Sequence, residues 1–126
     1  MLNFRQFEAG PDPFGRKYQV LLKWLQTAIS IRHADTVDVK FVLVDDREQR
    51  TEKTIALPHA ALLTAAREVN RPLDDAWCGR LAAMHLIHLI DTGEDMEKDL
   101  VTLTLPEIRG CAEVEQRVER EAIGAK

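Results

Sequence analysis

The chain lacks the features by which several large protein classes are recognised. Its six glycines are scattered singly, so it contains no glycine-rich loop for holding phosphate groups. It also lacks the Gly-x-Ser-x-Gly pattern of a hydrolase nucleophile. No stretch approaches the roughly 20 apolar residues that a membrane span requires. Residues 1–10 lack the basic start and apolar run of a signal peptide, so neither a membrane segment nor a leader is expected.

Cysteine and concentrated positive charge are also scarce. Cys78 and Cys111 are the two cysteines, and neither belongs to a Cys-x-x-Cys pair, which favours free thiols in a reducing cytoplasm. The net charge is −4, and residues 91–126 hold ten acidic and five basic side chains. Nucleic acid is therefore not an expected partner, because binding its phosphates requires a clustered basic surface. The acidity belongs to the C-terminal third.

Length and composition predict one domain over residues 1–126. Hydrophobic residues make up 45% of the chain and charged residues 30%, which is an ordinary globular balance. Residues 1–16 are predicted to form an irregular N-terminal arm, because two prolines within Gly10–Pro13 restrict the backbone and remove donors. Three phenylalanines are candidate anchors for this arm: Phe4, Phe7 and Phe14.

An alternation with a period of two predicts a sheet over about residues 17–57. Residues 17–33 form either one long bent strand or two strands broken near residues 26–28, and we favour the single strand. Further strands are expected at 37–44 and 50–57. Their connections are short, which favours an antiparallel meander of three to four strands. In the first strand the alternation places one set of side chains on a common face: Tyr18, Val20, Leu22 and Trp24.

Two to three helices are predicted to follow the sheet and pack on it, giving an α+β fold. Pro58 ends the sheet, and residues 58–69 have helical spacing. The segment from Asp74 to Asp91 is apolar around most of its circumference, so it is expected to be the buried core helix. Residues 100–105 are expected to form a short edge strand or an extended segment. Residues 106–126 are then expected to form a peripheral helix and tail, surface-lying or in contact with a partner, with a thin apolar stripe: Ile108, Cys111, Val114 and Val118.

One histidine constellation lies on the predicted core helix. His85, His88 and Asp91 are spaced three apart, so their side chains point along one side of a helix. Two imidazoles and a carboxylate suit zinc or iron, and His33 and His59 are candidates for further ligands. The spacing differs from the His-Glu-x-x-His metalloprotease motif. Histidines in an apolar helix more often pack and hydrogen-bond within the protein, so a structural role is the favoured interpretation.

Other reactive side chains also have a structural interpretation. Cys78, near His85, is a candidate nucleophile, but it lies inside the helix, where a buried core thiol is the commoner outcome. Cys111 is expected to be a small packing residue, and Trp24 and Trp77 to be core anchors rather than a ligand cage. Four carboxylates near strand ends are candidates for an acid–base pair, although a solvated turn accounts for the last two: Asp35, Asp38, Asp45 and Asp46.

These patterns favour a non-enzymatic binding or protein-interaction module. Its partner surface is expected to be the uncovered sheet face or the acidic C-terminal third. The alternative is a metal-assisted enzyme that uses His85, His88 and Asp91. A homodimer is also expected, because an exposed apolar sheet face favours association. The side chains expected on that face are Leu21, Leu25, Val42 and Val44.

Overall fold

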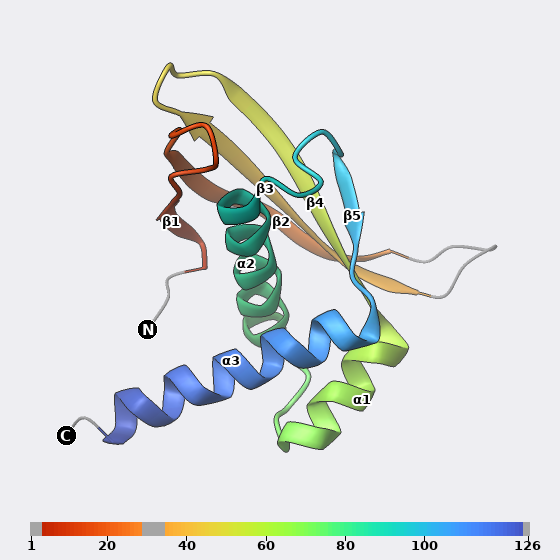
Figure 1. The fold of residues 1–126 in the computed structure, drawn as a ribbon. Helices are drawn as coiled ribbons and strands as arrows, with labels where there is room; N and C mark the ends of the chain where they lie inside the picture. Colours follow the sequence, from red (N-terminus) through yellow and green to blue (C-terminus); the bar gives the residue numbers. More distant parts are fainter. Residues whose placement is uncertain (1–3, 29–34, 125–126) are drawn as a thin grey trace.

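The computed structural model describes residues 4–28 and 35–124, and it contains one five-stranded sheet and three helices (Figure 1). The strands lie in chain order, β1-β2-β3-β4-β5. The first four pair antiparallel as a meander, whereas β5 runs parallel to β4. The predicted α+β fold is confirmed. The strands are β1 (Gln6–Ala9), β2 (Tyr18–Ala28), β3 (Thr36–Asp45), β4 (Arg50–Pro58) and β5 (Leu100–Thr102).

The prediction of a wholly irregular N-terminal arm was wrong, because β1 lies within it. Phe7 in β1 pairs with Val20 in β2, and its ring packs edge-on against the ring of Phe41 at 6.2 Å between centroids. A four-residue strand is too short to show a clear alternation, which is why the sequence did not reveal it. Phe4 and Phe7 anchor the arm as expected, but Phe14 is 82% exposed.

Strand β2 is a single strand as far as Ala28, and a bulge interrupts its alternation. Leu22 lies opposite Phe41, but Trp24 lies opposite the next residue, Lys40, so Lys23 is the extra residue. The bulge moves Trp24 to the outer face of the sheet, where the ammonium group of Lys40 lies 5.5 Å from the centroid of its ring. The prediction that Trp24 shares a face with Leu22 was therefore wrong, and Leu25 packs against the core instead. Residues 29–33 of the predicted strand lie outside the described residues.

Helix α2 is the centre of the core, as its sequence predicts. It packs across one face of the sheet against β1, β3 and β4 (Figure 1). Side chains of β3 and β4 on that face, among them Phe41 and Ile55, are fully buried. Helices α1 and α3 pack against each other, and α3 also contacts α2. No helix in the described part of the chain is long and apolar enough to cross a membrane. The helices are α1 (His59–Val69), α2 (Asp75–Thr92) and α3 (Leu105–Gly124).

The helix ends follow from local hydrogen bonding. The Asp74 carboxylate accepts from the Trp77 amide at 2.8 Å and begins α2, and Gly93 ends it with a positive φ of 76°. Asn70, in the left-handed conformation, ends α1. At the start of α3 the Thr104 amide donates to Glu107 Oε1 at 2.9 Å, while the Glu107 amide donates to Thr104 Oγ1 at 3.4 Å. This reciprocal pair is a capping box.

Two buried charged residues fix the loop after α2 and the connection between α1 and α2. The Lys53 ammonium donates to the backbone carbonyls of Asp95 and Lys98, which fixes the acidic loop after α2. Burial lowers the pKa of Lys53, although nearby carboxylates oppose this effect. Glu115 of α3 accepts from Arg71 at 2.9 Å and from Arg80 at 3.1 Å. Glu115 thus ties α3 to α2 and to the α1–α2 connection.

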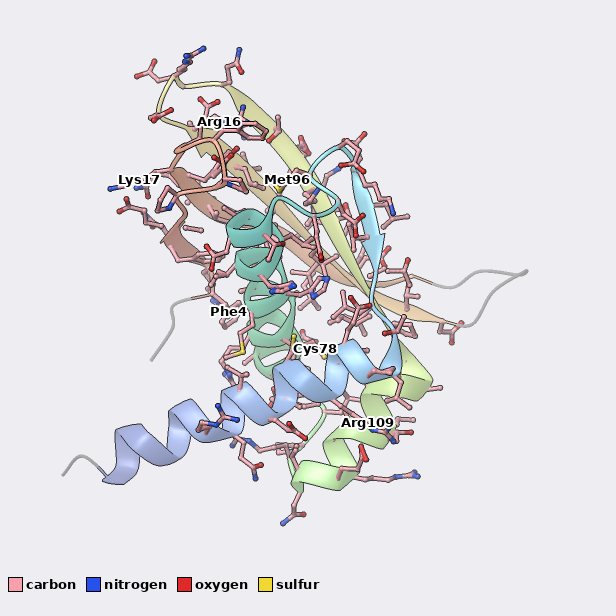
Figure 2. The ribbon with its side chains drawn as sticks, in the orientation of Figure 1. Phe4, Arg16, Lys17, Cys78, Met96 and Arg109 are labelled. Carbon is pink, nitrogen blue, oxygen red and sulfur yellow. The ribbon has the colours of Figure 1, made fainter. Side chains whose placement is uncertain are left out.

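Gly79 provides a test of how the N-terminal arm packs on α2. A Cβ atom at Gly79 would lie 2.4 Å from a ring carbon of Phe4, whose side chain lies beside α2 (Figure 2). We expect Gly79→Ala to lower the free energy of unfolding by about 1–3 kcal/mol, because the ring must move away. In a Phe4→Ala background the same change is expected to raise it by up to about 1 kcal/mol, because alanine favours helix. Urea denaturation of the four proteins measures this, and equal effects in both backgrounds would contradict the contact.

Candidate functional site

An open cleft of about 350 Å³ lies between α2 and α3. Its lining is mainly apolar, and among the residues that the structure describes no lysine or arginine contributes to it. Most small-molecule sites have this character: an apolar concave surface with a few placed polar groups. The lining residues are Met84, His85, His88, Glu107, Gly110, Cys111 and Val114.

Helix α2 places His85 on the side that α3 covers. The residue is 5% exposed, and its Nε2 atom is buried without a hydrogen-bond partner. Glu107 Oε2 is the acidic oxygen beside it, at 3.7 Å, which is too long for a hydrogen bond. Burial lowers the pKa of His85, and the nearby charge of Glu107 opposes this effect without overcoming it. His85 is therefore a neutral imidazole at neutral pH.

The capping box of α3 places Glu107 at the mouth of the cleft. Its Oε1 atom accepts from the amide and the hydroxyl of Thr104, at 2.9 Å and 3.0 Å. The Oε2 atom is directed to the His85 side. Sequence analysis missed Glu107, although the Thr-x-x-Glu spacing from Thr104 to Glu107 is a recognisable signal for the capping interaction. Which neighbour its second oxygen faces depends on how α3 crosses α2, and local sequence does not encode that crossing.

The structure brings together two of the three predicted metal ligands. The rings of His85 and His88 lie 6.1 Å apart between centroids, and both residues line the cleft. The His88 side chain is 58% exposed, with Nε2 at 3.7 Å from Glu94. Asp91 is exposed and is not part of the lining. Within residues 4–28 and 35–124, no group of three or more His, Cys, Asp or Glu side chains is arranged to hold a metal ion.

The additional histidine candidates are His59 and His33. His59 is exposed at the start of α1, and it is not among the residues of the lining. His33 lies outside the described residues. Metal binding at His85 and His88 stays a prediction.

Both cysteines are protonated thiols. Cys78 is buried in the core, and burial raises its pKa to about 12, with Asp75 and Asp74 adding to the effect. The expectation of a buried core thiol is confirmed. Cys111 lines the cleft, and burial raises its pKa to about 11. A nucleophilic cysteine needs a lowered pKa, so neither thiol is activated for that chemistry.

The predicted carboxylate candidates have local roles or are exposed. Asp38 accepts from the hydroxyl of Thr36 at 2.8 Å. Asp45, at the other end of β3, accepts from the amides of Arg47 and Gln49 and so shapes the turn before β4. Asp35 and Asp46 are exposed. These side chains therefore form no acid–base pair within the described residues.

A different buried carboxylate, Asp12, was missed by sequence analysis. Burial alone raises its pKa, but hydrogen bonds from the amides of Arg16 and Phe14 and from the hydroxyl of Tyr18 outweigh that effect and lower the pKa. All of these bonds organise the turn between β1 and β2. Asp12 is thus a structural carboxylate.

Comparisons with protein-family models, with curated proteins and with solved structures found no match for this chain. Its function is therefore inferred from the cleft itself.

The burial of His85 has a consequence for stability against pH. Because its pKa is lowered in the folded state, the unfolded chain takes up the proton first as pH falls below about 6.5. The contribution of neutral His85 to stability is thus lost as pH falls through that range. We expect His85→Leu to lose less free energy of unfolding than the wild type between neutral pH and about pH 5.

Urea denaturation across that pH range measures the difference. Ile90→Val, a substitution in the same helix that involves no titratable group, is expected to keep the pH dependence of the wild type. A His85→Leu variant with the same pH dependence as the wild type would show that His85 is not held neutral by burial.

Proposed function

We propose that this chain is a non-enzymatic binding module and that the cleft between α2 and α3 is its ligand site. The observation that carries the proposal is the His85 Nε2 atom, which is buried without a partner in an open apolar cleft. An unsatisfied buried polar atom costs about 1–3 kcal/mol. Such atoms are uncommon in folded proteins and call for an explanation, and a bound ligand that hydrogen-bonds Nε2 supplies one.

Two further observations support binding rather than catalysis. The Cys111 thiol, which lines the cleft, has a pKa of about 11 and is a poor nucleophile at neutral pH. The Oε1 atom of Glu107 accepts hydrogen bonds from Thr104, so one oxygen of this carboxylate has a structural role in capping α3. Free thiols at Cys78 and Cys111 also favour a reducing compartment such as the cytoplasm.

The second candidate is a metal-assisted enzyme that uses His85, His88 and Asp91 with zinc or iron. Its support is that His85 and His88 share the cleft. Asp91 would have to approach from outside the lining, or Glu107 would have to replace it as the carboxylate ligand. Metal analysis of the purified, untagged protein separates the candidates: stoichiometric zinc or iron that is lost in His85→Leu favours the enzyme.

The binding module is tested by comparing the stability and the ligand binding of His85→Leu. Leucine removes the unsatisfied nitrogen, so the free energy of unfolding at neutral pH is expected to stay level or to rise by about 1–3 kcal/mol. Binding of 2-phenylethanol, followed by amide chemical shifts along α2 and α3, is expected to weaken about 3- to 10-fold, as for one lost hydrogen bond.

Ile90→Val is the matched control, because Ile90 is fully buried in α2 and does not line the cleft. It is expected to lose about 0.5–1.5 kcal/mol of stability and to bind as the wild type does. A large loss of stability in His85→Leu, with binding unchanged, would assign His85 to the core and remove the proposal.

We also propose that the protein forms a homodimer through the outer face of the sheet. Leu21 is 41% exposed there, and Trp24 and Val44 are partly exposed nearby, whereas Val42, which pairs with Leu21, is buried. Leu21→Lys is expected to shift sedimentation equilibrium toward the monomer, because a charge would enter the apolar contact. A wild type that is monomeric at every accessible concentration would end this proposal, and a partner protein would then be the remaining candidate for this face or for the acidic C-terminal third.

A further inference from the structure

The polar atoms of the α2–α3 cleft have a distinct hydrogen-bonding character. His85 Nε2 is buried and unpartnered, and Glu107 Oε2 lies 3.7 Å away with its other oxygen already engaged. Because His85 is neutral, its Nε2 atom can carry the lone pair and accept a hydrogen bond. In the tautomer that carries its proton on Nδ1, the cleft offers two acceptors side by side.

The spacing of these two acceptors suits a single donor atom placed between them. His85 Nε2 and Glu107 Oε2 are 3.7 Å apart, which is too far for a hydrogen bond between them. A ligand nitrogen can nevertheless lie about 2.9 Å from both atoms. An ammonium group has three N–H donors, so it can serve both acceptors at once. A hydroxyl has one donor, and a carboxylate has none and would face the negative charge of Glu107.

The charge of the lining points in the same direction. Glu107 contributes a carboxylate, and the described residues of the lining include no lysine or arginine that would attract an anion. Glu94 lies beside His88 at 3.7 Å, which adds a second acidic group near the cleft. The remaining surface is provided by Met84, Cys111 and Val114 and favours an apolar body.

We propose that the α2–α3 cleft binds a primary ammonium group carried on an apolar body, with the nitrogen donating to His85 Nε2 and Glu107 Oε2. This inference rests on the proposed function, in which the cleft is a ligand site. A free arylalkyl amine and the side chain of a lysine on another protein share this chemistry. The charged hydrogen bond to Glu107 is the stronger of the two contacts, because its acceptor and its donor are both ionised.

The test compares ligands of matched shape at neutral pH by isothermal titration calorimetry. 2-Phenylethylamine is expected to bind about 10-fold more tightly than 2-phenylethanol, and 3-phenylpropanoate is expected to bind more weakly than the alcohol. Nα-acetyl-lysine methylamide, whose side-chain amine is free, distinguishes a protein lysine from a small arylalkyl amine as the source of the ammonium group. Binding as tight as that of the phenyl amine favours a lysine side chain, and weaker binding favours a small arylalkyl amine.

Glu107→Gln is the decisive variant, because glutamine also completes a capping box and so preserves the start of α3. It is expected to reduce the preference for the amine over the alcohol to within about 2-fold. Glu113→Gln removes a charge from the same helix at an exposed position outside the lining. It is expected to keep the full preference.

The outcomes separate the two proposals. If Glu107→Gln keeps the preference, or if the propanoate binds as tightly as the amine, the ammonium site is wrong. If the alcohol and the amine bind equally and both depend on His85, the ligand site stands and its assignment to amines is overturned. If none of the three ligands binds, the ligand site and the amine assignment both fail.

Discussion

The need to cover helix α2 on several sides determines the arrangement of the rest of the protein. Its buried side chains surround most of the helix, from Trp77 and Cys78 at one end to Leu89 and Ile90 at the other. One sheet face cannot bury such a helix, because a sheet contacts only one side of it. The sheet covers the first side, α3 covers another, and the ring of Phe4 fits against Gly79. The histidine cleft forms where α3 leaves part of α2 uncovered.

Long-range contacts of charged side chains keep α3 in that position. Glu115 is buried and accepts hydrogen bonds from Arg71 and Arg80, which both lie outside α3. On the side toward α1, Arg109 forms an ion pair with Glu68 at 2.8 Å (Figure 2). The exposed pair contributes little, whereas the buried carboxylate would be costly to leave unpaired. The crossing of α2 and α3 thus depends on ionic contacts as well as on apolar packing, and the crossing sets the width of the cleft.

Sequence patterns were sufficient for most elements, with β1 as the exception, and insufficient for the faces that their side chains occupy. The change from a period of two to helical spacing near Pro58 is a local signal, and it corresponds to the structure. The bulge at Lys23 was not visible, because a single extra residue changes no composition and yet moves Trp24 to the opposite face. In the same way, the histidine spacing identified His85 and His88. The neighbour of His85 is Glu107, from a helix that local sequence cannot place.

The bulge in β2 also affects the edge of the sheet. Strand β1 pairs with Tyr18–Leu21, and no described strand pairs with the same side of β2 beyond that point. An unpaired strand of this kind is a template on which other chains can add and form aggregates. Lys23 and the irregular backbone stand where that free edge begins, and both features interrupt the regular ladder that an added strand would need. One extra residue therefore interrupts the regular ladder at the point where a further strand would have to pair with β2.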